Sequence, residues 1–94
     1  MSTIIHPMLE ALTKGSVWLQ TANSTYQLVP EGVKLKVFRV KTKDPERQIG
    51  KVMVGSYWSV ISSGSNDCLQ IIGDKILRTV IRQWSEDWET AETW

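Results

Sequence analysis

The sequence predicts an α+β fold with a short N-terminal helix, an antiparallel β-meander of four to five strands and a long amphipathic C-terminal helix. Apolar residues alternate with polar ones through the middle of the chain, which is typical of half-buried strands. Clusters of turn-forming residues separate these segments. Near the C-terminal end, apolar residues recur at helical spacing. With 94 residues, the chain is expected to form one domain, residues 1–94.

The first helix is predicted over residues 7–14. Pro7 suits the first position of a helix, and Gly15 suits the position just after its last turn. So short a helix is not stable alone, so it must pack on the rest of the protein. The apolar stripe that would make this contact consists of Met8, Leu9, Ala11 and Leu12.

The alternating segments predict an antiparallel meander that can also curl into a partial barrel, because both alternation phases carry apolar residues. Pro30-Glu31-Gly32 predicts a three-residue hairpin loop. Gly55 lies inside the long fourth strand and predicts a bend or bulge. Residues 68–72 could instead extend the last helix backwards, but Gly73 favours a strand. The expected strands are 16–21, 25–29, 33–42, 49–61 and 68–72.

The C-terminal helix is predicted over residues 74–90, with Asp74 as its N-cap. Its apolar residues follow one another at steps of one, three or four, which places them on a single helical face. They are Ile76, Leu77, Val80, Ile81, Trp84 and Trp88.

The net charge of +1 conceals two oppositely charged segments. Residues 33–51 contain seven Lys or Arg and two Asp or Glu, whereas residues 83–94 contain four Asp or Glu and no base. The acidic end closes on Trp94. Residues 89–94 are therefore expected either to complete the domain or to form a mobile acidic and aromatic tail. Such a tail could dock into a basic pocket of a partner or fold back onto the basic strand of this chain.

One face of the predicted sheet combines aromatic residues with lysines. Such a face can be covered within the fold, can bind a protein or a second copy of the chain, or can stack single-stranded nucleic acid. Most aromatic residues of small domains are covered within the fold; of the two binding interpretations, protein contact with aromatic anchors and a charged rim is preferred. The predicted partner-binding residues are Trp18, Lys34, Lys36, Phe38, Arg39, Tyr57 and Trp94.

The chain offers little material for catalysis. His6 is the only histidine and Cys68 the only cysteine, so no catalytic residue, metal site or cofactor site is predicted. The lone cysteine and the absence of an export signal or spanning segment predict a cytoplasmic protein without membrane contact. We expect a small non-catalytic binding protein (a regulator, inhibitor or assembly subunit) that contacts another protein or itself, as a homo-oligomer. The alternative is a single-stranded nucleic-acid-binding module that uses the same aromatic and basic face.

Overall fold

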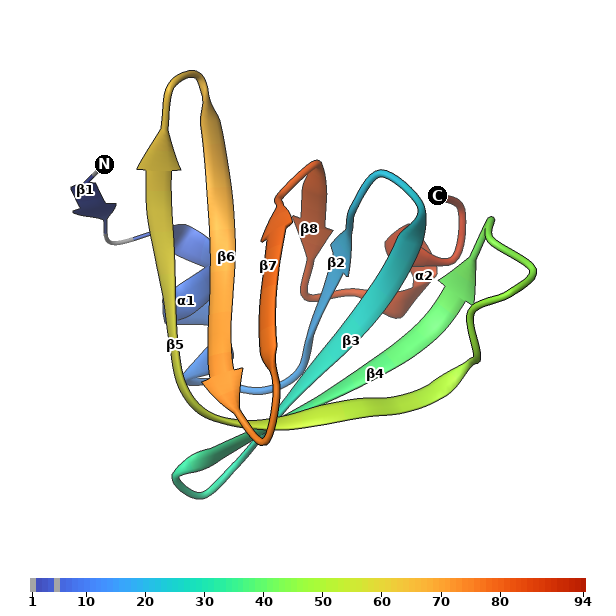
Figure 1. Cartoon of the computed structure of the whole chain (residues 1–94), viewed down its shortest axis with the longest axis horizontal. Helices are drawn as coiled ribbons and strands as arrows, with labels where there is room; N and C mark the ends of the chain where they lie inside the picture. Colours follow the sequence, from blue (N-terminus) through green and yellow to red (C-terminus); the bar gives the residue numbers. More distant parts are fainter. Residues whose placement is uncertain (1, 5) are drawn as a thin grey trace.

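The computed structural model describes residues 2–4 and 6–94, and it consists mainly of antiparallel β-strands (Figure 1). Two short helices accompany them. In chain order the elements are β1 (Ser2–Ile4), α1 (Pro7–Leu12), β2 (Val17–Gln20), β3 (Ser24–Glu31), β4 (Lys34–Thr42), β5 (Gly50–Ser63), β6 (Asn66–Gly73), β7 (Ile76–Val80), β8 (Gln83–Ser85) and α2 (Trp88–Ala91).

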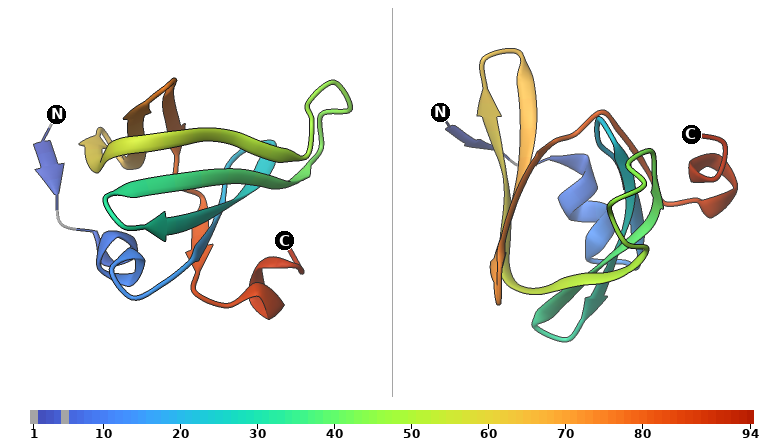
Figure 2. Two further views of the ribbon diagram at one scale, coloured as in Figure 1. Left: turned by 90° about the horizontal axis from the view of Figure 1, so that it is seen from below. Right: turned by 45° about the vertical axis from the view of Figure 1, so that its right-hand side comes forward.

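Each strand from β2 to β7 pairs with its neighbour in sequence, so the predicted antiparallel meander is present. β1 adds to β5, and β8 pairs with the far side of β2. Only residues 81–82 separate β7 from β8. One continuous stretch of chain therefore pairs with β6 at its start and with β2 at its end. This stretch brings the two ends of the sheet together, and the sheet coils around a single core (Figure 2).

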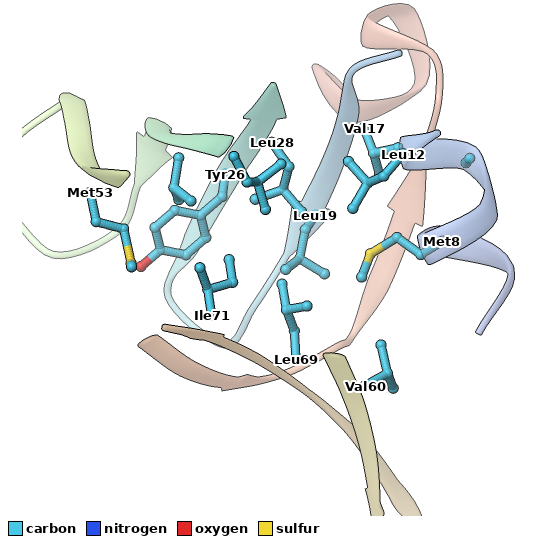
Figure 3. Packing of buried hydrophobic residues seen from close by; sticks show 13 residues of the cluster. Met8, Leu12, Val17, Leu19, Tyr26, Leu28, Met53, Val60, Leu69 and Ile71 are labelled. Carbon is cyan, nitrogen blue, oxygen red and sulfur yellow. The ribbon is translucent and has the colours of Figure 1, made fainter. Parts of the chain in front are cut away.

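The core lies inside the coiled sheet, where apolar side chains from opposite strands meet (Figure 3). Val17 and Leu19 of β2 are completely buried, as are Leu69 and Ile71 of β6. Alternation along each strand places every second residue on this inner side. Helix α1 closes one end of the core with buried Met8, Ala11 and Leu12.

The predicted bend in the fourth strand is confirmed. The register of β5 against β6 shifts between Gly55 and Tyr57, where β5 turns sharply in Figure 1. A Cβ at Gly55 would collide with a methyl group of Ile71, and a Cβ at Gly73 would collide with the carbonyl group of Val54. Glycine at both positions lets the two strands approach closely where the sheet bends.

Two local predictions are corrected in detail. Helix α1 ends at Leu12 rather than at residue 14, and the His6 side chain caps it by accepting a hydrogen bond from the Met8 amide. The first long hairpin turns at residues 32–33 instead of at Pro30, because Glu31 and Lys34 still pair across the strands. Gly32 has a φ of 61°, which matches the glycine-first two-residue turn that suits the twist of a hairpin.

The predicted C-terminal helix over residues 74–90 is wrong. This segment contains β7, β8 and the beginning of α2. Asp74 lies in the β6–β7 turn and does not cap a helix; its carboxylate accepts a hydrogen bond from the amide of Val54 in β5. The β-branched residues Ile76, Val80 and Ile81 lose side-chain freedom in a helix, and the extended form gains main-chain pairing with both β6 and β2. Strand pairing therefore prevails over the helical spacing.

The predicted fold class changes accordingly. Neither helix reaches seven residues, and only α1 contributes to the main core cluster. The α+β description with a long C-terminal helix is replaced by a coiled, mainly β domain. Residues 68–72, which the sequence left open between strand and helix, belong to strand β6.

Candidate binding surfaces

The predicted aromatic face exists on the outer side of β2, β3 and β4. Trp18 lies opposite Gln27, Gln27 lies opposite Phe38, and Phe38 lies opposite Lys51. Directly opposite residues of an antiparallel sheet point to the same side. Trp18 and Phe38 therefore share one face with Lys51 on the neighbouring strand, although both aromatic residues are half-buried.

Lys34 and Lys36 share this outer face, but Arg39 does not. The ammonium group of Lys36 lies 2.9 Å from the Glu31 carboxylate, and that of Lys34 donates to the Ser56 hydroxyl at 2.9 Å. Arg39 instead points to the inner side.

Arg39 lies against buried Tyr26. It donates hydrogen bonds to the Tyr26 hydroxyl at 3.2 Å and to the Gln48 carbonyl at 3.1 Å, and its guanidinium carbon lies 5.3 Å from the Tyr26 ring centre. The sequence analysis grouped Arg39 with the two lysines. Side chains alternate along a strand, so residues 34, 36 and 38 lie on one side and residue 39 on the other, and this alternation is the signal that could have separated them.

The C-terminal segment covers part of the aromatic face. The Trp18 and Trp88 rings lie 6.0 Å apart between centres, and Ala91 of α2 is fully buried. The Lys41 ammonium group donates to the main-chain oxygens of Glu92 and Trp94 at 2.9 and 2.6 Å. The acidic segment therefore lies against the basic strand of its own chain, and its main-chain oxygens make the contact.

Tyr57 lies apart from the other predicted anchors, on the outer side of β5, β6 and β7. It is opposite Ile72, which is opposite Ile76 on β7. Tyr57 is 57% exposed and Ile76 is 68% exposed, so this row of apolar side chains faces solvent. A second row on the same side consists of Ile61, Cys68 and Val80, which help to line a shallow pocket of about 230 Å³. We call these two rows the β7 surface; its members are Tyr57, Ile61, Cys68, Ile72, Ile76 and Val80.

Strand β7 has one open edge beside this surface. The Gly73 amide bonds to the Lys75 carbonyl, and the Ile81 amide bonds to the Asp67 carbonyl. Facing residues of an antiparallel pair alternate between bonded and non-bonded positions. In this register Leu77 and Thr79 direct their main-chain groups toward β6, so those of Ile76, Arg78 and Val80 point away from it.

No strand in the described part of the chain pairs with this edge over Ile76–Val80. Pairing resumes only at Arg82, whose amide donates to the Gln20 carbonyl at 3.0 Å. We call the amide and carbonyl groups of Ile76, Arg78 and Val80 the open edge. Unpaired edge groups of this kind can pair with another chain.

A cleft of about 330 Å³ lies along the open edge, between β7 and the β2–β3 hairpin. Its walls include Leu77 and Arg78 on one side, Tyr26 on the other, and Arg47. Arg47 lies 3.3 Å from the Asp44 carboxylate, but none of the ion pairs found among the described residues involves Arg78. The lining of the cleft therefore includes two arginines, one of which is paired with a carboxylate of its own chain.

The two residues with nucleophilic or acid–base chemistry lie in different surroundings. His6 lies 3.6 Å from the Asp67 carboxylate and packs edge-on against Trp84. Cys68 belongs to the β7 surface and is a free thiol. In the part of the chain that the structure describes, no group of three His, Cys, Asp or Glu side chains could hold a metal ion. No described helix is long and apolar enough to cross a bilayer.

The sequence analysis missed the open edge because it assigned residues 76–80 to a helix. The signal that could have revealed it is the composition of residues 76–81, in which four of six residues are β-branched. Read with a period of two, Ile76, Arg78 and Val80 fall on one side and Leu77 and Thr79 on the other. The observed exposure follows that alternation.

Comparison with known proteins adds no relative to this description: the chain matches no family model, no curated protein and no solved structure.

Proposed function

We propose that this chain is a small non-catalytic binding protein that acts through protein–protein contact, and that the β7 surface holds its partner. The observation that carries this proposal is the exposed row of Tyr57, Ile72 and Ile76 next to the open edge. An apolar centre with a polar rim is the usual anatomy of protein interfaces. Tyrosine is a favoured anchor residue in such interfaces. A lone cysteine, Cys68, suits a cytoplasmic setting.

The partner we propose is a different protein. Two copies of β7 that paired antiparallel over their full length would place Arg78 directly opposite Arg78, and like charges facing each other destabilise a pair of strands. A mass above that of the monomer in sedimentation equilibrium, abolished by Ile76→Asp, would instead support the homo-oligomer.

Site-directed photocrosslinking in cells that express the protein tests the proposal. The photoreactive amino acid benzoylphenylalanine is placed at Tyr57, at Ile76 or, as a control, at Glu89. Glu89 is exposed on α2, whose main contacts are with β2 and β8 and not with the strands that carry the β7 surface. We expect one discrete crosslinked protein from positions 57 and 76 and none from position 89. Equal crosslinking from all three positions, or none from 57 and 76, would overturn the proposal.

The second candidate is binding of single-stranded nucleic acid on the outer face of β2–β4. The observation that favours it is the row of Trp18 and Phe38 beside Lys36 and Lys51, since base stacking and phosphate neutralisation need this combination. It requires α2 to leave Trp18. A labelled thymidine 15-mer tests it: binding that weakens steeply with salt, and that Phe38→Ala and Lys36→Ala reduce, would support this candidate. No retardation at low salt would remove it.

A further inference from the structure

We infer that the open edge of β7 accepts an extended segment of the partner by strand addition, and that this segment carries an acidic residue flanked at two residues on either side by apolar ones. The inference deepens the proposed function and rests on it. It adds the conformation and side-chain chemistry of the partner.

The main chain of the partner would pair with the open edge. The amide and carbonyl groups of Ile76, Arg78 and Val80 point to this edge, and no described strand occupies it. The edge is limited at one end by the β6–β7 turn and at the other by Arg82, which already bonds to Gln20. About five residues of an extended chain match this length.

The side chains of β7 set the sequence of the partner. Ile76, Arg78 and Val80 point to the outer side of the sheet, and a paired segment places three of its own side chains directly opposite them. Apolar residues of the partner opposite Ile76 and Val80 would extend the two apolar rows of the β7 surface. An acidic residue meets Arg78, which has no carboxylate partner among the residues that the structure describes. For a segment that pairs antiparallel to β7, the resulting pattern is apolar–x–acidic–x–apolar, and the amides of these three residues bond to the open edge.

The cleft receives the two intervening side chains of the segment. These residues point to the opposite side from their neighbours and thus toward Tyr26 and Leu77. Arg47 at the cleft wall disfavours a basic residue there. Small polar residues such as threonine suit both the space and strand conformation.

The test uses the full chain and a blocked heptapeptide, Thr-Val-Thr-Glu-Thr-Val-Thr, in an NMR titration. A second peptide has lysine in place of the central glutamate. A third carries N-methyl groups on the two valines and the glutamate, which remove the amides that would bond to β7. We expect the first peptide to shift the amide signals of Ile76, Arg78 and Val80, to bind about threefold or more tightly than the lysine peptide, and to lose binding on N-methylation.

Charge reversal supplies the second part of the test. Arg78→Glu should invert the preference, so that the lysine peptide binds about threefold or more tightly than the glutamate peptide. Lys14→Glu is the control, because Lys14 is exposed near α1 and this substitution reverses a positive charge away from β7. In this variant the glutamate peptide should still bind more tightly than the lysine peptide.

Strand addition would be overturned if the N-methylated peptide bound as well as the unmethylated glutamate peptide, or if the peptide shifted amide signals only outside β7. It would also be overturned if the Arg78→Glu variant still bound the glutamate peptide more tightly than the lysine peptide. Crosslinking from positions 57 and 76 that persists in such a case would leave the proposed protein contact standing and reject only its strand-addition form. Loss of that crosslinking would reject both.

Discussion

The Lys41 ammonium group donates a hydrogen bond of 2.6 Å to the main-chain oxygen of Trp94. This bond joins the basic strand β4 to the segment that follows α2. With the companion bond to Glu92, it fixes the acidic segment beside the aromatic face and brings the two oppositely charged segments into contact.

Lys41→Met should release this segment while leaving the sheet intact. The substitution removes two hydrogen bonds from a charged donor. Because these bonds are partly exposed, we expect the docking of the C-terminal segment to weaken by about 1 kcal/mol. Hydrogen exchange should accelerate in residues 88–94 and stay unchanged in β6. Lys43→Met is the matched control, since the ammonium group of Lys43 makes no hydrogen bond or ion pair within the described part of the chain. Equal acceleration of hydrogen exchange in the Lys41 and Lys43 variants would contradict the conclusion that Lys41 holds this segment in place.

The Trp18–Trp88 contact should show up as a coupling energy. Aromatic pairs contribute about 0.5–1.5 kcal/mol beyond the apolar area that they bury. A double-mutant cycle with Trp18→Ala and Trp88→Ala, followed by urea unfolding, measures this coupling. Additive effects of the two substitutions would show that the rings, 6.0 Å apart, do not stabilise the docked α2.

Gly73→Ala should destabilise the protein by about 3 kcal/mol or more, because overpacking against rigid backbone cannot be relieved by rotating a side chain. The new Cβ would lie 2.8 Å from the Gly55 Cα and still closer to the Val54 carbonyl group. Thermal unfolding provides the measurement. Gly15→Ala is the control, since its Cβ would meet nothing within 4 Å. Similar melting temperatures for the two variants would contradict the close approach of β5 and β6.

Leu69→Ala should lower the free energy of unfolding by about 2–5 kcal/mol, because truncating this fully buried side chain leaves a cavity inside the coiled sheet. Ile76→Ala should change stability by about 0.5 kcal/mol or less, because Ile76 is 68% exposed. Chemical denaturation of both variants tests the assignment of residues 76–80 to a strand that faces outward. A large loss at Ile76 would mean that its side chain is buried, as in the predicted helix.

Much of the meander could be predicted from the sequence. Strands β2 to β6 lie where alternation and turn residues indicated, and Gly55 marks the expected bend. The candidate surface was harder to predict. Lys34, Lys36 and Phe38 share one face as expected, but Arg39 turns inward to Tyr26, and Tyr57 lies on the other side of the sheet's bend.

The sequence by itself determined the alternating strands, the helix begun by Pro7 and the separation of charge along the chain, because these depend on neighbouring residues. Only the tertiary structure decided the state of residues 76–85, whose apolar spacing fits either a helix or a strand. The choice depends on β6 and β2, which offer main-chain partners to this segment from two directions. The same pairing leaves Ile76, Arg78 and Val80 with one unpaired edge, a property of the assembled sheet that no local pattern contains.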